Sequence, residues 1–173
     1  MVLALYLLRH AKSAWDTPSA EDFDRPLSER GRREADWVAG LVRARGGSPS
    51  RILCSSSQRT RETLASIVPV LSRDASIDIT RRIYEAPAER LLAALGEQST
   101  SHQSVMLVGH NPGLEDLANL LAGGGDPGLI AALRRKYPPA GLAHFEFELE
   151  RWSDIRAVSG RLVAFDVPPR DGS

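Results

Sequence analysis

Short apolar runs of strand length, separated by segments with helical periodicity, are the feature that most constrains how this chain folds. Residues 2–8 form a continuous apolar run, a second short strand is expected at residues 51–54, which are apolar after Arg51, and a further buried run covers residues 105–108. Continuous apolar runs suit strands that are covered on both faces, so they indicate a parallel sheet with helices on either side. The alternation, which continues to about Gly123, therefore predicts an α/β fold.

Helices are expected between these strands because their start and stop residues are present. Ser28 is placed to cap a helix that runs to about Arg45, and Gly46-Gly47 ends it. The other elements expected in this part of the chain are a loop at residues 16–26, helices at residues 58–71 (disturbed at Pro69), 87–95 and 112–121, and a strand at residues 77–83 near one side of the sheet.

The pattern changes near residue 123. Residues 123–128 are rich in glycine and predict a flexible loop, and residues 129–137 predict a short helix. Two further strands, at residues 142–149 and 162–167, are joined by a polar segment, which indicates an antiparallel addition to the sheet. We therefore expect one three-layer α/β/α domain over residues 1–167, with a mostly parallel central sheet and an antiparallel C-terminal strand pair, and a loose tail at residues 168–173.

Composition limits which partners and which cellular compartment are expected for the protein. The chain has 173 residues and a formal net charge of zero, so no overall field draws it to nucleic acid or to an anionic membrane, and neither is expected as a partner. Its one cysteine, Cys54, excludes an intrachain disulfide and a cysteine zinc site and fits a reducing compartment. We expect no signal or membrane-spanning segment and a cytoplasmic location. No apolar stripe calls for a particular oligomeric state.

Chemically useful side chains follow the predicted strands at one edge of the sheet, where open α/β sheets bind ligands. Arg9 and His10 end the first strand, Arg59 lies in the first turn of the helix after the second, Glu85 follows the third and His110 follows the fourth. Arginine pairs with phosphate oxygens through its fork of donors, and it disfavours a proton on a nearby histidine. A neutral histidine is able to act as a nucleophile.

His110 also lies in a turn that favours anions. Asn111 is placed to cap the following helix and Pro112 to take its first position, which points the positive end of that helix at the predicted site. The two remaining histidines are expected elsewhere. His102 precedes its strand and should lie at the opposite edge of the sheet, and His144 should face solvent.

A metal site is a weaker interpretation of the same residues. Only His10 and His110, with Glu85 nearby, are placed to bind a cation, and two arginines beside them would oppose it. No close pair of histidines or cysteines has the spacing of a zinc site, and no glycine-rich turn follows the first strand as nucleotide-binding loops require. We therefore expect no metal and no organic cofactor.

The motif LRHAKS at residues 8–13 resembles the Arg-His motif of the histidine phosphatase, or phosphoglycerate-mutase-like, superfamily. Within it, the chain looks most like the small SixA-type phosphohistidine phosphatases. The resemblance is supported, in order along nearly the whole chain, by DRPLSERG at residues 24–31, SSSQRTRET at 55–63, VGHNPGLE at 108–115, YPPAG at 137–141, Trp152 and PPR at 168–170.

This resemblance implies roles for the residues named above. His10 would be the nucleophile that becomes phosphohistidine, and Arg9, Arg59 and His110 would bind the phosphoryl oxygens together with it. Glu85 matches the carboxylate that many members use as the proton donor. The family needs no metal or organic cofactor.

Three positions depart from patterns common in the family. Ala11 and Ser56 stand where many relatives have Gly and Pro, and Asp16 stands near a position where many mutase-like members have Asn. Ala11 adds a methyl group near the nucleophile, and Asp16 would repel phosphate unless it points away. Neither Ala11 nor Ser56 removes a reacting group.

The resulting hypothesis is a metal-independent phosphatase that acts through His10 on phosphohistidine in a protein. No insertion between the strands is long enough to form a lid, and an open site suits a protein substrate better than a small phosphate ester. A small-molecule phosphomonoesterase of the same superfamily is the first alternative. A non-catalytic phosphate-binding module is the second, although such a module would not need His10.

Overall fold

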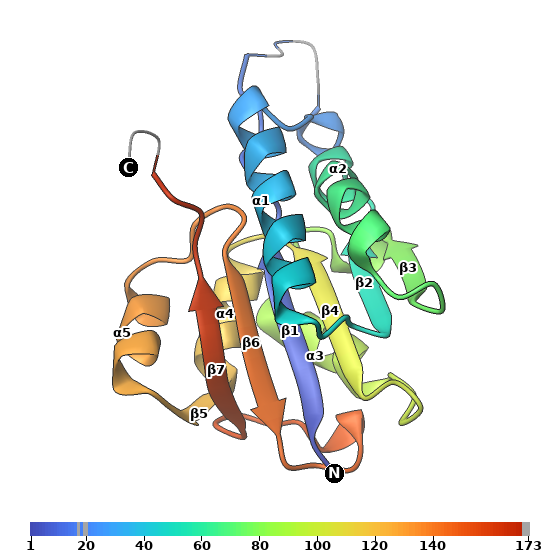
Figure 1. Ribbon diagram of the computed structural model, residues 1–173, viewed down its shortest axis with the longest axis vertical. Helices are drawn as coiled ribbons and strands as arrows, with labels where there is room; N and C mark the ends of the chain where they lie inside the picture. The colour runs from blue at the N-terminus through green and yellow to red at the C-terminus, as the bar shows by residue number, and fades with distance from the viewer. Residues whose placement is uncertain (17, 19–20, 171–173) are drawn as a thin grey trace.

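One seven-stranded mixed sheet organises the residues that the computed structural model describes, namely 1–16, 18 and 21–170. The strand order across the sheet is β3-β2-β4-β1-β6-β7-β5 (Figure 1). The strands are β1 Leu3–Arg9, β2 Arg51–Ser55, β3 Ser76–Thr80, β4 Ser104–Gly109, β5 Ala122–Gly125, β6 Leu142–Phe147 and β7 Gly160–Asp166.

Strand direction agrees with the sequence prediction. β1, β2, β3 and β4 are mutually parallel, whereas β6 runs antiparallel to both of its neighbours, β1 and β7. β3 lies at one edge of the sheet, as its alternating pattern indicated. Because β6 is antiparallel to both β1 and β7, β7 runs in the same direction as β1. The segment after β7 therefore lies at the same end of the sheet as the segment after β1.

Helices cover both faces of this sheet (Figure 1). α1 and α2 pack on one face and α3, α4 and α5 on the other, which is the predicted three-layer arrangement. The helices are α1 Glu29–Arg45, α2 Gln58–Ile67, α3 Ala88–Gly96, α4 Gly113–Leu121 and α5 Pro127–Arg135, with short 3-10 turns η1 Asp22–Asp24, η2 Val68–Val70, η3 Arg81–Ile83 and η4 Trp152–Asp154. No described helix is long and apolar enough to cross a membrane.

The two faces of β1 contribute to two separate apolar cores because side chains alternate along a strand. Leu7 packs into the core beneath α3 and α4, and Leu8 into the core beneath α1 and α2. Ala11 is fully buried in the second core, and its methyl group therefore packs away from solvent.

The first turn of α1 holds the segment that follows His10. Ser28 caps the helix by accepting a hydrogen bond from the amide of Gly31, and its own amide donates to the carbonyl oxygen of Lys12. A Cβ atom at Gly31 would lie 1.9 Å from that oxygen, so only glycine permits this approach. A Cβ atom at Gly40, farther along the same helix, would meet nothing within 4 Å beyond its own stretch of helix backbone.

The glycine-rich segment at residues 123–125 was wrongly predicted to be a loop. It belongs to β5, a short edge strand that pairs in parallel with β7. Glycine is required there because a Cβ at Gly123 would lie 1.8 Å from the carbonyl oxygen of Val158, and Gly125 has a φ of 131°. The prediction failed because glycines that admit a close backbone neighbour look the same in sequence as glycines of a loop.

Smaller differences concern element ends. Residues 81–83 form the turn η3 rather than the end of a strand, β6 ends at Phe147, and α4 begins at Gly113, one residue after Pro112. Pro69 ends α2 early and leads into η2, as its position predicted. Residues 22–24 of the predicted loop form η1. Residues 17, 19 and 20 of that loop and 171–173 of the predicted tail lie outside the described residues.

Candidate active site

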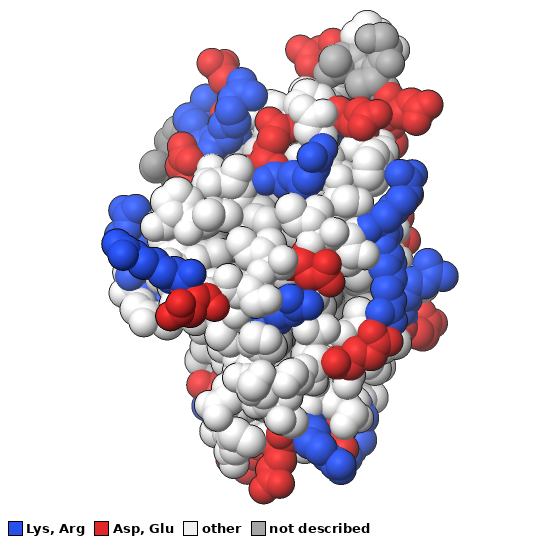
Figure 2. All heavy atoms as spheres, turned by 90° about the vertical axis from the view of Figure 1, so that its right-hand side faces the viewer, with Lys and Arg blue, Asp and Glu red and all other residues white. Residues whose placement is uncertain are grey.

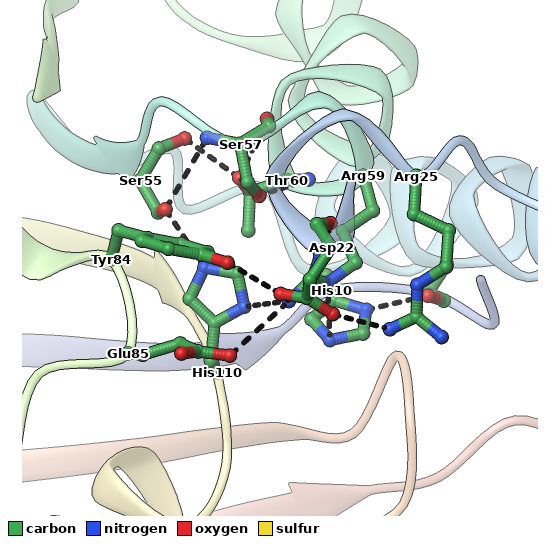
Figure 3. Close-up of polar contacts among 11 residues, drawn as sticks. His10, Asp22, Arg25, Ser55, Ser57, Arg59, Thr60, Tyr84, Glu85 and His110 are labelled. Carbon is green, nitrogen blue, oxygen red and sulfur yellow. Dashed lines mark hydrogen bonds and ion pairs between the residues drawn. The ribbon is translucent and has the colours of Figure 1, made fainter. Parts of the chain in front are cut away.

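The carboxyl ends of β1, β2 and β4 bring four of the predicted residues together, because parallel strands end at the same edge. Figure 3 shows three of them, His10, Arg59 and His110. Arg9 is the last residue of β1 and His10 follows it, Arg59 lies in the first turn of α2, and His110 follows β4. His10, Arg59 and His110 are 7%, 3% and 4% exposed. The ring centroids of His10 and His110 lie 5.3 Å apart.

Hydrogen bonds fix the tautomer of His10. Its Nδ1 lies 2.7 Å from the carbonyl oxygen of Ala11, which can only accept, so Nδ1 carries the proton. Nε2 is then unprotonated, and it accepts a hydrogen bond from Nε of Arg59 at 3.3 Å. Burial lowers the pKa of His10 well below its ordinary value and outweighs the hydrogen bond to Ala11, which raises it, and the positive charges of Arg59 and Arg9 lower it further. His10 is therefore neutral at pH 7, with Nε2 as the nucleophilic atom.

His110 is held in the opposite tautomer. Arg59 can only donate, so Nδ1 of His110, 3.3 Å from Nη2 of Arg59, is the acceptor, and Nε2 donates to the hydroxyl of Ser55 at 2.8 Å. Burial, followed by the charge of Arg59, lowers the pKa of His110 to about 3. The ring is thus neutral, and the nitrogen that faces Arg59 carries no proton.

Arg9 retains unused donor capacity. Its Nη1 donates to the carbonyl oxygen of Tyr137 at 2.8 Å, and its Nε is buried without a hydrogen-bond partner among the described residues. Asn111 binds the same carbonyl oxygen through its Nδ2 at 3.0 Å. Asn111 also accepts from the amide of Glu115 through Oδ1 and so supports the first turn of α4, but the predicted cap was one residue off, because Pro112 takes the N-cap position and the helix begins at Gly113.

Asp22 is a site residue that the sequence did not reveal (Figure 3). Its carboxylate accepts from Nη2 of Arg59 at 3.1 Å and from the hydroxyl of Tyr84, and its carbonyl oxygen accepts from Nη1 of Arg59 at 2.6 Å. Burial alone would raise the pKa of this carboxyl, but the bond from Tyr84 and the charge of Arg59 outweigh it and lower the pKa to about 2. Asp22 therefore occupies both terminal nitrogens of Arg59, Nη1 with its carbonyl oxygen and Nη2 with its carboxylate.

Arg25 is a second residue that was not predicted. Its Nη2 donates to Asp22 at 3.1 Å, its guanidinium lies 3.8 Å above the ring of Trp15, and its Nε and Nη1 are buried without hydrogen-bond partners among the described residues. Arg25 thus adds a cation beside the cluster (Figure 3). It lies in the DRPLSERG stretch, which was the only sequence signal available for it.

Glu85 lies at the rim of the cluster rather than within it. Its side chain is 59% exposed, and Oε1 lies 4.0 Å from Nη2 of Arg59. The backbone of Glu85 has a φ of 49°, a conformation that non-glycine residues adopt infrequently. Its neighbour Tyr84 packs edge-on against His110 and Phe23.

The other two histidines lie outside this cluster. His102 precedes β4 and so lies at the opposite edge of the sheet, as expected. The prediction that His144 faces solvent was wrong: its ring stacks on Tyr6 with centroids 4.4 Å apart and is half-buried, and burial lowers its pKa. Within the part of the chain that the structure describes, no group of three or more His, Cys, Asp and Glu side chains is arranged to hold a metal ion.

Comparisons with known proteins agree with the fold and with the motifs. A sequence model of the histidine phosphatase superfamily (branch 1) matches residues 5–87. An uncharacterised protein of Mycobacterium tuberculosis is 33% identical over 93% of this chain and 99% of its own length.

Solved structures give the same result. A putative phosphohistidine phosphatase SixA from Agrobacterium tumefaciens is 35% identical, with a TM-score of 0.81 over 96% of this chain and 98% of that chain. A putative SixA from Nakamurella multipartitia is 24% identical and has the same fold, with a TM-score of 0.84 over 97% of both chains. The chain belongs to the histidine phosphatase superfamily.

Proposed function

We propose that this chain is a phosphatase that forms a phosphohistidine on His10, needs no metal ion and removes phosphate from phosphohistidine in a protein. The observation that carries the proposal is the unprotonated Nε2 of His10, which is held beside the Arg59 guanidinium by a hydrogen bond at the other ring nitrogen. The similarity to a putative phosphohistidine phosphatase supports the choice of substrate.

In the first step, the lone pair of His10 Nε2 attacks phosphorus and forms an N–P bond. The bond between phosphorus and the substrate nitrogen breaks, and the leaving imidazole keeps that electron pair and takes a proton from solvent. Arg9 and Arg59 neutralise the phosphoryl oxygens during this transfer. A bound phosphate dianion also favours a proton on Nδ1 of His110, which then donates to a phosphoryl oxygen.

In the second step, water attacks phosphorus on the side opposite Nε2. The N–P bond breaks, its electron pair returns to His10, and inorganic phosphate leaves. Glu85 takes the proton from water in this proposal, and its position at the rim, with Oε1 4.0 Å from Nη2 of Arg59, supports that role. An ester substrate would also need Glu85 to protonate its leaving oxygen in the first step, whereas a phosphohistidine nitrogen leaves readily once it is protonated.

The rim of the site favours a large substrate. Asp22 and Trp15 are 47% and 76% exposed there, and Glu85 is also exposed. A broad, accessible rim suits a phosphohistidine carried on a folded protein. A small-molecule phosphate ester is the second candidate, since the same nucleophile and cations would serve it.

The test compares the wild type with His10→Ala and with His102→Ala, a histidine at the other edge of the sheet. Each is incubated with a histidine-phosphorylated protein in the presence of chelator, and phosphate release is measured. We expect release by the wild type and His102→Ala, no release by His10→Ala, and an acid-labile phosphoenzyme in the first two only. Equal phosphate release by His10→Ala and the wild type would contradict the role of His10 as the nucleophile. Loss of phosphate release in the presence of chelator would contradict metal independence.

The alternatives have distinct outcomes in the same experiment. Hydrolysis of p-nitrophenyl phosphate but not of the phosphoprotein favours the small-molecule phosphomonoesterase. Phosphate binding without turnover of either substrate favours the non-catalytic phosphate-binding module.

A further inference from the structure

A cationic groove, formed in part by residues near the C-terminal end of the chain, borders the predicted active site. Its main hollow, about 450 Å³ in volume, is lined by the cations Lys12, Arg30, Arg135, Lys136 and Arg170 and by a single carboxylate, that of Glu34. Glu34 is only 7% exposed, and its Oε1 accepts from the amide of Lys12 at 3.3 Å and lies 4.0 Å from Nε of Arg30, so this one carboxylate offsets part of the charge of one of the five cations. Cations therefore dominate the surface that this groove presents.

Topology places the groove at the same edge of the sheet as His10. α1 begins at this edge, residues 136–141 lead into the antiparallel strand β6, and residues 167–170 follow β7, which runs in the same direction as β1 (Figure 1). Lys12 is two residues beyond His10, and Tyr137, between two lining segments, accepts a hydrogen bond from Arg9. Both walls of the groove are thus continuous with the segments that hold Arg9 and His10.

Apolar side chains line the groove together with the cations. They are Pro138, Pro139, Phe165, Val167 and Pro168. A second hollow of about 230 Å³ shares several of the same lining residues and adds Arg33 and Trp37 along α1. Two adjoining hollows lined by cations and apolar side chains are complementary to a peptide segment that carries several carboxylates and an apolar side chain.

The charge of this groove is local. The whole chain has no net charge, and the face of the molecule around β3 and α2 carries acidic and basic side chains interspersed (Figure 2). We infer that the groove binds an acidic segment of the phosphoprotein substrate and so brings its phosphohistidine to His10. This inference rests on the proposed function for its role in turnover, but the binding itself is measurable without catalysis.

The first experiment measures binding of an unphosphorylated, fluorescein-labelled 12-residue peptide (an ordinary probe length of about 40 Å when extended) that contains several glutamates and one leucine. A second peptide has glutamine in place of glutamate. We expect the wild type to bind the acidic peptide about tenfold more tightly in low salt, with the difference shrinking as salt screens the charges. Arg135→Glu together with Lys136→Glu should remove this preference.

The matched control is Arg73→Glu together with Arg156→Glu, which changes net charge equally at two exposed positions that precede β3 and β7 at the opposite edge. It should keep the preference. Thermal unfolding of both double variants verifies folding. Equal binding of the two peptides by the wild type, an equal loss in both double variants, or equally tight binding of a single-stranded oligonucleotide would overturn the inference.

Turnover then tests the role in the reaction. With phosphohistidine placed in the two peptides, Arg135→Glu/Lys136→Glu should raise KM for the acidic peptide about tenfold and leave its kcat and both constants for the glutamine peptide unchanged. If no peptide is hydrolysed but the acidic peptide still binds in the groove, the proposed function is wrong and the groove is still a binding site for acidic peptides. If both peptides are hydrolysed with equal KM, the inference about the groove is wrong and the proposed function still holds.

Discussion

Replacing Asp22 by asparagine tests whether an internal carboxylate competes with the phosphoryl group. Asp22 engages both terminal nitrogens of Arg59, which a phosphate ion needs for bidentate binding. The substitution removes the charge and keeps an oxygen that accepts from Tyr84. We therefore expect phosphate and vanadate to bind more tightly to Asp22→Asn than to the wild type.

The size of the effect follows from the pKa of Asp22. A value of about 2, against an ordinary 3.8, corresponds to at most about 2.5 kcal/mol in favour of the charged form. Solvent screens a side chain that is 47% exposed, and Tyr84 supplies part of the stabilisation, so about 1 kcal/mol is attributable to Arg59. The inhibition constant of phosphate should therefore fall about fivefold.

The assay is competitive inhibition of turnover by phosphate and vanadate, with calorimetric binding of phosphate as a second readout. Asp24→Asn is the control, because it removes the same charge from an exposed position in the same turn. An unchanged or weaker affinity in Asp22→Asn would refute the reasoning and would mean that Asp22 helps binding by holding Arg59 in place.

Three further predictions follow from the structure. Glu85→Gln should slow ester hydrolysis at least about 100-fold but phosphohistidine hydrolysis less than about tenfold, measured as kcat on both substrates; equal losses would contradict the assigned role. His10 and His110 are neutral in the fold but take up protons near pH 6.5 when unfolded, so the free energy of unfolding should fall as the pH drops below that value towards the folded pKa of His110, about 3. His110 alone contributes a slope of about 1.4 kcal/mol per pH unit, and His10 adds to it; an unfolding free energy that is flat between pH 6.5 and 4 in denaturant titrations would contradict this. Gly31→Ala should lower the free energy of unfolding by about 2 kcal/mol or more, whereas Gly40→Ala in the same helix should raise it by about 0.5–1 kcal/mol. Similar values for the two variants would show that the backbone near Gly31 shifts without cost to admit a side chain.

The parts of the fold with a strong repeating pattern were predictable from the sequence. Residues 2–8 read as a buried strand because every position is apolar, and α1 was bounded correctly because Ser28 and Gly46 act as its cap and stop. β5 was not predictable, because its glycines are explained only by Val158 and β7, which lie far along the chain.

The same distinction holds for the site. His10, Arg59 and His110 were predictable because each follows a strand whose direction the pattern indicated, and the structure brings them together; their catalytic roles stay predictions. Asp22 and Arg25 lie in a segment without periodicity. Asp22 reaches Arg59 because Phe23 packs against Tyr84, a contact that no local pattern indicates.

The central place of β1 has a consequence for how the chain folds. β1 is the first strand, yet its two neighbours are β4 and β6, so Leu5 pairs with Val105 and with Phe145. Such distant pairings give a high contact order, which slows folding because large loops must close before the contacts form. During refolding, the strand that carries His10 is completed only when β6 docks. Recovery of phosphate binding should therefore coincide with the slowest step of refolding rather than with the early formation of helices.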